Sequence, residues 1–394
     1  MTNNRTYDLS SPAFYGDLDA MHAAFTWMRA NEPVYHDEQS GLWGITKHAD
    51  LAEVERDAAT FTSHASYRMN ESPGENNMIA QDDPGHLDQR RLVNRRFTPR
   101  AVKELEPRLR ALIDELLDVG AANGGMEVVH DLAAQLPARL TAEMLGFPEE
   151  RWEDVKSWSE RLMRLDTAPR DPEILMGVMT ACMEFNEVLL ETVPARRECP
   201  MDDLLSVWAN AELPSGPMTG EAIFNETGLF ISGGAETTRT VISRGLWAFA
   251  QHPDQWEALA ANPALVPGAV EEVIRWVTPL NNMFRTATRK VDVHGTTLPE
   301  GSRVALLYPS ANRDEDVFDE PFTFDIRRDP NPHLAFGQGT HFCLGASLAR
   351  LELRVLFEEM SRRFTDLRVV SDPDIEANVF VGAVKHFDLA FTSR

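Results

Sequence analysis

The chain has 394 residues, of which 43% are hydrophobic and 25% charged, a composition typical of a folded globular protein and not of a disordered or fibrous one. Its 38 Lys and Arg residues against 62 Asp and Glu residues give a net charge of −24. This charge argues against a nucleic-acid partner and against docking on anionic membranes, because both need an excess of basic side chains.

Cysteine usage and hydropathy predict the compartment. The three cysteines, Cys182, Cys199 and Cys343, are an odd number in a long chain, so no disulfide framework is indicated. The N-terminal residues lack the apolar run of a signal peptide. No segment reaches the roughly 20 uninterrupted apolar residues that a membrane-spanning helix needs. We therefore expect a cytoplasmic protein without a membrane span.

The hydrophobic pattern predicts mostly helices. Short strands are expected first, at 33–36 and 41–46. Apolar residues at three- and four-residue spacing then predict amphipathic helices at 101–119, 131–145, 151–164, 172–191, 220–251, 265–277 and 345–364. Further strand-like segments lie at 283–306 and 379–392. Because strands on either side of the helical block must pair with each other, we expect a mainly α protein with a small β region (α+β), in a single domain over 1–394.

An irregular segment at 307–342 leads to Cys343. Loops of this length inside compact domains tend to be functional. Gly337, Gly339 and Gly345 allow tight turns and a close approach of the backbone to a flat ligand. Since a helix is expected to begin just after Cys343, its N-terminus should lower the pKa of the thiol and favour the thiolate, the form that binds metal.

Other interpretations of the cysteines are available. Cys343 alone could be a buried structural residue at a helix start. A zinc site formed by Cys343 with His341 and His333 lacks the usual ligand set, since no Cys-x-x-Cys or paired-His spacing is present. Cys182 and Cys199 have no glycine-rich surroundings and are interpreted as core residues.

The spacing of Phe336, Gly339, His341, Cys343 and Gly345 gives Phe-x-x-Gly-x-His-x-Cys-x-Gly. This pattern resembles the haem-binding signature of the cytochrome P-450 superfamily, and the resemblance extends over almost the whole chain. It implies a triangular helical prism that encloses haem b. In such proteins the thiolate, here of Cys343, is the axial iron ligand and pushes electron density onto the iron. Gly345 would leave room for the porphyrin.

Two charged motifs match the same family. Glu272 and Arg275 form Glu-x-x-Arg on one helix face, where they can pair. With Arg328 they resemble the Glu-Arg-Arg network that holds the loop ahead of the cysteine, a structural role.

The segment Ser232–Thr238 (Ser-Gly-Gly-Ala-Glu-Thr-Thr) lies within the long helix expected at 220–251. Each glycine there disfavours a helix interior by roughly 1 kcal/mol relative to alanine, so a mid-helix distortion is expected. Close packing against another helix is the plain alternative. The family resemblance instead implies that Thr237 hydrogen-bonds dioxygen and that Glu236 relays protons from solvent.

Four basic residues match the family's haem-propionate contacts. His86 and Arg90 are four residues apart and would share a helix face. Arg285, on the strand after the Glu-x-x-Arg helix, and His341 complete the set. Charged donors of this kind bind carboxylates well.

The resemblance implies a monooxygenase that inserts one oxygen atom of O2 into a C–H bond. A peroxide-driven enzyme is disfavoured because the Glu236–Thr237 pair is present. A haem-thiolate sensor without turnover is an alternative from another class, and the same pair argues against it.

Electrons would have to come from a partner, since the chain has no nucleotide-binding extension. The segment from His86 to Arg110 contains eight Lys and Arg residues but only three Asp and Glu residues. A charged helix face is the plain explanation. The sharper hypothesis is a cationic surface for an acidic iron–sulfur ferredoxin, itself reduced by a ferredoxin reductase, formed by Arg90, Arg91, Arg95, Arg96, Arg350 and Arg354.

The substrate pocket is expected to be apolar and to hold its ligand largely by shape. The predicted lining residues are Met78, Ile79, Phe230, Ala235, Met283, Phe284, Phe380 and Val381, and Met176 and Met179 lie in another predicted pocket segment. The chain is similar to actinobacterial family members that oxidise sterol side chains and branched lipids. Hydroxylation of a macrolide, a terpene or another secondary metabolite is the alternative.

Overall fold

The computed structural model describes residues 5–72 and 74–394. The helices are α1 (Pro12–Gly16), α2 (Leu18–Asn31), α3 (His48–Arg56), α4 (Gly85–Val93), α5 (Pro99–Lys103), α6 (Glu106–Asn123), α7 (Gln135–Leu145), α8 (Trp152–Leu162), α9 (Pro172–Glu198), α10 (Leu204–Ala209), α11 (Gly220–Gln251), α12 (Pro253–Ala261), α13 (Val266–Val277), α14 (Tyr308–Ala311) and α15 (Ala346–Arg363).

The strands are β1 (Val34–Asp37), β2 (Leu42–Ile45), β3 (Phe61–Thr62), β4 (Gly125–Glu127), β5 (Glu212–Leu213), β6 (Gly216–Pro217), β7 (Met283–Ala287), β8 (Val291–Val293), β9 (Thr296–Leu298), β10 (Arg303–Leu306), β11 (Phe364–Val369), β12 (Asp374–Ile375), β13 (Val384–His386) and β14 (Asp388–Ser393). The expectation of a mainly α protein with a small β region is confirmed.

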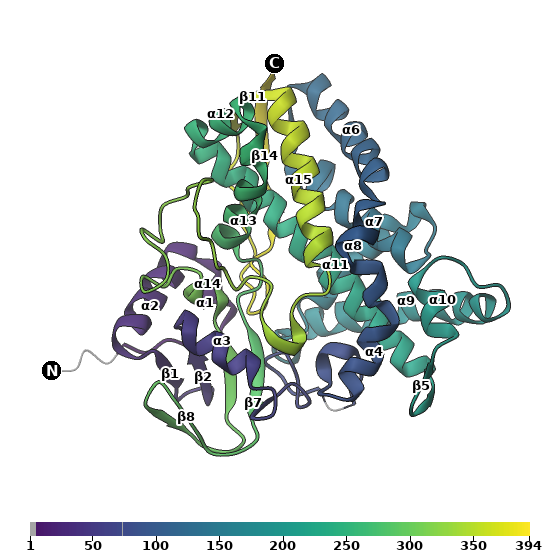
Figure 1. The fold of residues 1–394 in the computed structure, drawn as a ribbon, viewed down its shortest axis with the longest axis vertical. Coiled ribbons are helices and arrows are strands. Elements are labelled where there is room, and N and C mark those ends of the chain that lie inside the picture. Colours follow the sequence, from purple (N-terminus) through teal and green to yellow (C-terminus); the bar gives the residue numbers. More distant parts are fainter. Residues whose placement is uncertain (1–4, 73) are drawn as a thin grey trace.

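The helices form a triangular body in which the five-stranded and the three-stranded sheet occupy two different corners (Figure 1). The five-stranded sheet has the order β1-β2-β10-β7-β3, in which β10 runs parallel to β2. The expected pairing of early and late strands is therefore confirmed for these two strands. The C-terminal strand β14 pairs instead with β11 and with β4, in a second sheet at the other end of the molecule.

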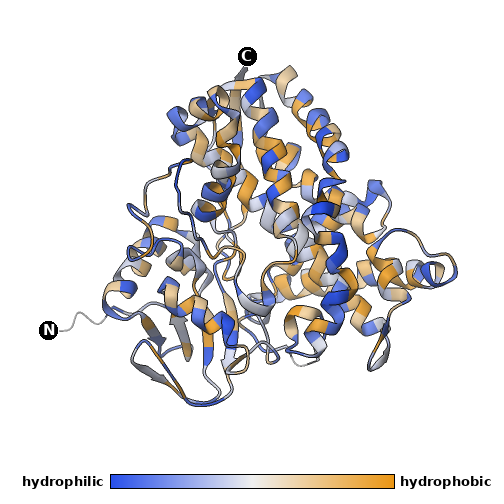
Figure 2. Ribbon diagram, in the orientation of Figure 1, coloured by the Kyte–Doolittle hydropathy of each residue, from blue (hydrophilic) through white to orange (hydrophobic). Residues whose placement is uncertain are grey.

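The core is built from the apolar faces of amphipathic helices. Figure 2 shows hydrophobic (orange) and hydrophilic (blue) residues alternating along these helices. The largest cluster joins α6, α11, α13 and α15, with Leu112, Leu246, Val273 and Leu356 among its buried members. A second cluster packs α7, α8 and α9 against the other part of α11. The central helix α11 is therefore covered by other helices along its length. In the described part of the chain, no helix is long and apolar enough to span a membrane.

Several helix boundaries differ from the sequence prediction. The helix expected at 101–119 is divided into α5 and α6, because Pro107 begins a new helix in a position where its missing N–H is harmless. The helix α9 continues to Glu198, past the predicted end at 191, although Pro194 lies inside it. Residues 220–251 form one continuous α-helix, so the glycines at 233 and 234 do not interrupt it.

A buried carboxyl group fixes the segment before α4 to the central helix. Glu226 of α11 is fully buried, and its Oε1 accepts a hydrogen bond from the backbone N–H of Met78 at 2.7 Å. No hydrogen-bond partner of Oε2 is found in the described part of the chain. Burial raises the pKa of Glu226 to about 8, so the folded protein keeps this proton at neutral pH.

Replacing Glu226 with Gln should therefore stabilise the protein at alkaline pH. The unfolded chain loses this proton near a pKa of about 4.5, whereas the folded chain holds it up to about pH 8, so the parent protein loses stability as the pH rises through that window. Glutamine keeps an acceptor for Met78 and cannot ionise. We expect a gain on the order of 2–4 kcal/mol at pH 8 and almost none at pH 4.5, measured by denaturant unfolding.

The matched control is Glu221→Gln, at an exposed position on the same helix. It should leave the pH dependence of unfolding unchanged. An identical pH dependence in parent and Glu226→Gln would show that Glu226 ionises as easily in the folded protein as in the unfolded chain.

Candidate active site

A large cavity lies between α11, the loop that precedes α15, and the strand β7. Its wall brings together many of the residues that the sequence predicted: Met78, Ile79, Arg90, Phe230, Thr237, Met283, Arg285, His341, Cys343, Gly345 and Phe380. Since these residues come from positions between 78 and 380, the cavity is a product of the tertiary structure.

Cys343 lies on the cavity wall and is exposed to the open space there, whereas Cys182 is half-buried elsewhere. Cys199 is exposed, so its interpretation as a core residue is wrong. The backbone N–H of Cys343 donates to the carbonyl of Phe336 at 2.9 Å, which closes the loop three residues before α15 begins. The predicted lowering of its thiol pKa is wrong for the protein chain by itself. Burial raises the pKa of Cys343, and the backbone N–H groups of Gly345 and Ala346, with the charges of Arg90 and Arg350, oppose that rise only in part.

The glycines of this loop have different roles. Gly337 and Gly339 have φ values of +65° and +70°, which favour glycine. A Cβ on Gly339 would lie 2.5 Å from the backbone oxygen of Glu55, so this glycine lets the loop pack against α3. A Cβ on Gly345 would meet no protein atom within 4 Å, so this glycine leaves space at the cavity.

Unpaired cations line one part of the cavity. Arg285 is buried and donates to the carbonyl of Phe284 at 2.8 Å, and Arg90 donates to the carbonyl of Phe342 at 2.6 Å. No ion pair between either guanidinium and a carboxylate is found in the described residues. This part of the cavity therefore has positive charge available for an anionic ligand.

Two histidines adjoin these cations. The rings of His86 and His341 lie 4.4 Å apart, and the Nε2 atoms of both are buried with no partner in the part of the chain that the structure describes. His86 accepts or donates at Nδ1 toward Asp83, 2.9 Å away. Burial, with the positive charge of Arg285, lowers the pKa of His341 to about 2, so its imidazole is neutral.

Glu55 is a cavity residue that the sequence analysis missed. It lies in the last turn of α3, on the cavity wall, and accepts a hydrogen bond from the hydroxyl of Tyr308 at 2.5 Å. Burial raises the pKa of Glu55 to about 7, against the opposing effects of Tyr308 and Arg285. A lone Glu in a helix gives no signal in the sequence, because only the fold brings it beside Tyr308, more than 250 positions away.

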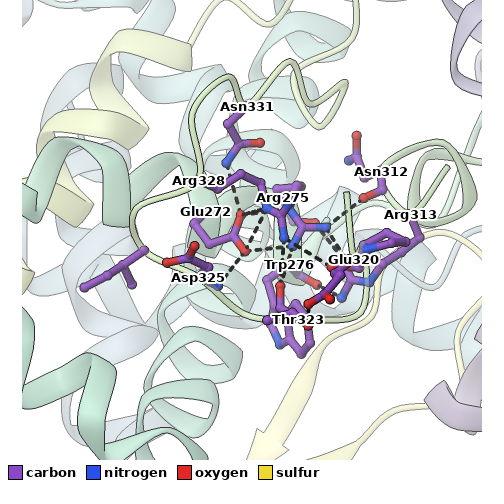
Figure 3. Close-up of polar contacts among 12 residues, drawn as sticks. Glu272, Arg275, Trp276, Asn312, Arg313, Glu320, Thr323, Asp325, Arg328 and Asn331 are labelled. Carbon is purple, nitrogen blue, oxygen red and sulfur yellow. Dashed lines mark hydrogen bonds and ion pairs between the residues drawn. The ribbon is translucent and has the colours of Figure 1, made fainter. Parts of the chain in front are cut away.

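The predicted Glu-Arg-Arg network is present (Figure 3). Glu272 is fully buried and pairs with Arg275 through two hydrogen bonds of 2.7 and 2.8 Å, and with Arg328 at 3.2 Å. It also accepts from the backbone N–H of Asp325 at 3.0 Å and from Asn331 at 3.1 Å. Removing one partner from such a buried pair typically costs about 3–5 kcal/mol, so this network fixes the loop from 319 to 331.

The arginines extend the network to the backbone. Arg275 donates to the carbonyls of Asn312 and Pro321, at 2.9 and 3.0 Å, and Arg328 donates to that of Asp319 at 2.7 Å. The side chain of Asn312 in turn accepts from the N–H of Leu334 at 2.7 Å, a short distance before the cysteine loop. The charge of Glu272 thus organises most of the irregular segment.

The neighbouring Glu271 joins the cysteine helix to α13. Its carboxylate makes two hydrogen bonds with Arg350, of 2.7 and 2.8 Å, and lies 3.2 Å from His333. Arg350 and His333 lower the pKa of Glu271 to about 2, although burial opposes this most strongly. Arg350 also lies over the ring of Phe336, 4.5 Å from its centroid, so its role is to hold the cysteine loop.

On α11, Thr237 and Glu236 face different surroundings. Thr237 lines the cavity, and its hydroxyl donates to the carbonyl of Gly233 at 2.8 Å. Glu236 is buried away from the cavity wall and pairs with Arg239 at 3.1 Å. Arg239 also pairs with Glu160 on α8. Glu236 and Thr237, the predicted acid–alcohol pair, are therefore neighbours in sequence but face different surroundings. The Glu236 side chain points toward the ion pairs that join α11 to α8.

Some pocket predictions are wrong. Phe284 follows Met283, which lines the cavity, but it is buried in another cluster because successive residues of a strand point to opposite faces. Val381 is buried in the same cluster as Phe380 and does not line the cavity. Ala235 is buried in the cluster that packs α7, α8 and α9 against α11 and does not line the cavity. Met176 and Met179 of α9 are 64% and 53% exposed on the outer surface.

The predicted basic surface also changes. Arg90 turns into the cavity, Arg350 is held by Glu271, and Arg354 pairs with Glu106 and Glu358 at 2.7 and 2.9 Å. Arg96 pairs with Asp202 at 2.6 Å. Within the segment from His86 to Arg110, the exposed basic residues for which the described ranges hold no carboxylate partner are Arg95, Arg100 and Lys103. The paired arginines are neutralised and are poor candidates for attracting a distant acidic protein.

Comparison with known proteins identifies the family. Residues 167–389 match the profile of the cytochrome P450 family. The steroid C26-monooxygenase of Mycobacterium tuberculosis (strain ATCC 25618 / H37Rv) is 40% identical over 396 residues, which cover 100% of this chain and 98% of the relative.

Solved structures of similar fold are also cytochromes P450. A mutant of P450 EryK in complex with erythromycin B has a TM-score of 0.87 and 34% identity, with 96% of this chain and 97% of that chain covered. A Mycobacterium marinum cytochrome P450 in complex with pseudoionone has a TM-score of 0.91 and 31% identity, with 99% and 100% covered.

The chain belongs to the cytochrome P450 family, and it is a haem-dependent monooxygenase. Enzymes of this family hold haem b with its iron bound by a cysteine. The cavity fits that group, since it has a cysteine on its wall and open space beside Gly345, and since the described residues offer no carboxylate to its arginines and no partner to the buried histidine nitrogens.

Proposed function

We propose that this enzyme hydroxylates a C–H bond in the side chain of a steroid. The carrying observation is the 40% identity with a steroid C26-monooxygenase from end to end, together with the apolar residues Met78, Ile79, Met283 and Phe380 on the cavity wall. A macrolide substrate is the second candidate, because the P450 EryK structure in complex with erythromycin B is 34% identical.

We also propose roles for the cavity residues. Cys343 holds the iron through its thiolate, which the metal would stabilise by binding the sulfur. Arg90, Arg285, His86 and His341 bind the haem propionates, an assignment supported by the missing carboxylate partners. When bound, haem supplies the activation of O2 and the insertion of one oxygen atom into the substrate.

In this scheme Thr237 would hydrogen-bond dioxygen and Glu236 would deliver protons from solvent. Thr237 lines the cavity together with two other hydroxyl residues of α11, Ser232 and Thr238, and its hydroxyl would have to release the carbonyl of Gly233 to donate into the cavity. Glu236 pairs through Arg239 with Glu160, which is partly exposed. Although burial opposes it, Glu236 and Glu160 raise the pKa of Arg239, so the guanidinium keeps its proton and orients the Glu236 carboxylate, and protons would reach Glu236 through water. A rotation of the Glu236 side chain toward Thr237 would complete the route.

We further propose that residues 1–394 form one domain. The support is the pairing of β2 with β10 and of β4 with β14, which joins segments from distant parts of the sequence. A cytoplasmic location stays a prediction from cysteine usage.

Replacing Cys343 with Ser should remove the Soret band that a thiolate-ligated, reduced and carbon-monoxide-bound haem produces, because a serine hydroxyl is a far weaker ligand. Thr237→Ala should keep that band and uncouple oxygen consumption from product formation, measured with an oxygen electrode and product analysis. The exposed Cys199→Ser is the control and should behave like the parent enzyme. A Cys343→Ser variant that retains the band would refute the assigned iron ligand.

Titration with cholest-4-en-3-one should displace a water ligand and shift the spin state of the haem, monitored in the absorption spectrum. The apolar wall of the cavity favours such a rigid hydrocarbon body. A shift with a macrolide or a terpene and none with the steroid would instead support the alternative substrate.

For electron supply, we propose that an acidic ferredoxin binds at the exposed surface formed by Arg95, Arg100 and Lys103. These residues lie on the segment that follows α4, and α4 contacts the cysteine loop through the bond from Arg90 to Phe342. Phe342 itself is 41% exposed, as expected for an apolar contact near such a surface. A ferredoxin reductase would reduce the partner.

Charge reversal should test this surface. Arg95→Glu with Arg100→Glu should slow reduction by a ferredoxin about tenfold or more at low ionic strength, with a smaller effect at high salt, in stopped-flow measurements. Arg289→Glu with Lys290→Glu, at exposed positions on the β7–β8 connection, is the charge-matched control and should have little effect. Unchanged reduction rates in the double variant would place the ferredoxin elsewhere.

A further inference from the structure

Two polar residues on the cavity wall belong to neither the proposed haem contacts nor the proton route. Tyr67 and Arg68 are 5% and 4% exposed, and both line the cavity. The wall around them is apolar and includes Ile79, Met163 and Phe380. A guanidinium in such a place is unfavourable unless its donors are used, so its hydrogen bonds need to be accounted for.

Arg68 forms an ion pair, but not all of its guanidinium N–H groups have a strong hydrogen-bond acceptor. Its Nη1 donates to Asp166 at 2.9 Å, and both side chains are almost completely buried. Its Nη2 lies 3.7 Å from the sulfur of Met163, a weak acceptor. For its Nε, no partner is found among the residues that the structure describes. The ion pair is therefore neutral as a whole and leaves donor capacity on the arginine unused.

The arginine is held in place by its surroundings. Its guanidinium carbon lies 4.1 Å from the centroid of the Phe380 ring. Asp166 accepts a further hydrogen bond from the backbone N–H of Met69 at 3.0 Å, which fixes the carboxylate. Tyr67 donates its hydroxyl to Glu75 at 3.1 Å. The guanidinium of Arg68 is thus preorganised. Its Nε is enclosed by protein atoms, so Nη2, which has only the weak sulfur acceptor, is the donor that a ligand oxygen could use without a large rearrangement.

The charge balance selects the kind of ligand. Because Asp166 already neutralises Arg68, an anionic ligand group would add an uncompensated negative charge to a buried site, where Glu75 is also close to Tyr67. A carbonyl or hydroxyl oxygen needs only a donor and adds no charge. A hydrogen bond from a charged donor to such an oxygen is among the stronger ones in proteins.

We propose that the Tyr67–Arg68 corner of the cavity binds a neutral acceptor oxygen, such as a ketone, on the otherwise apolar substrate. The inference rests on the proposed steroid function and adds a polar determinant to it. Arg68 contacts residues 163–166 and Phe380, whereas Cys343 lies on the loop before α15, so this oxygen and the oxidised C–H bond are bound by different walls of the cavity.

Spectral titration of the holoenzyme with three matched ligands tests the proposal. Cholest-4-en-3-one should bind roughly 10- to 100-fold more tightly than cholest-4-ene, which lacks the oxygen. Cholesteryl sulfate, an anionic ligand on a similar body, should bind more weakly than the ketone. The readout is the dissociation constant from the haem spin-state shift, which requires no turnover.

Variants then connect the preference to Arg68. The double change Arg68→Met with Asp166→Asn removes the pair without leaving a buried charge, and it should reduce the preference for the ketone to less than about threefold while cholest-4-ene binds as before. The matched control is Arg164→Met with Glu376→Gln, which removes an arginine–glutamate pair of 2.5 Å in which neither residue lines the cavity. It should keep the full preference.

Each outcome decides a separate point. Equal binding of the ketone and the hydrocarbon to the parent enzyme would overturn the inference alone and leave the steroid function standing. A ketone preference that survives in a folded, haem-loaded double variant would also overturn it. Failure of all three sterols to bind would overturn the proposed steroid function and this inference with it.

Discussion

The buried carboxylate of Glu272 is the constraint on which the active-site architecture depends. An ionised group without water must receive hydrogen bonds from the protein, and Arg275, Arg328, Asn331 and the backbone of Asp325 supply them. Because these groups must donate to Glu272, the long segment that carries them, which has little regular structure, is held in one conformation. That segment ends at the loop carrying Cys343, so the position of the cysteine on the cavity wall follows from a charge on α13.

The cavity itself is divided by electrostatics. One part carries Arg90 and Arg285, for which residues 5–72 and 74–394 supply no carboxylate partner although the chain is strongly negative overall, and that contrast supports a bound anion. Another part pairs Arg68 with Asp166 and so is neutral. Between them the wall is mainly apolar. The same residue type therefore serves two purposes, according to whether a buried acid accompanies it.

Sequence reasoning succeeded where the signal was local. The span of α11 was predicted at its observed ends, and the cysteine loop, the Glu-x-x-Arg pair and Thr237 were found from residues close together in the chain. It failed for Ala235, Phe284 and Val381, because the direction of a side chain depends on how its helix or strand is rotated against its neighbours. It also credited Arg350 and Arg354 with free charge, although acids on α13 and α6 neutralise them.

The sequence by itself determined the class of protein, since a fixed spacing around Cys343 and helical periodicity are properties of neighbouring residues. Only the tertiary structure decided which charges are paired, which are buried and which face the cavity. Glu55 meets Tyr308, and Arg68 meets Asp166, across separations of 253 and 98 positions. Such contacts arise from the packing of whole elements, and no local pattern encodes the desolvation that gives each of these groups its chemical character.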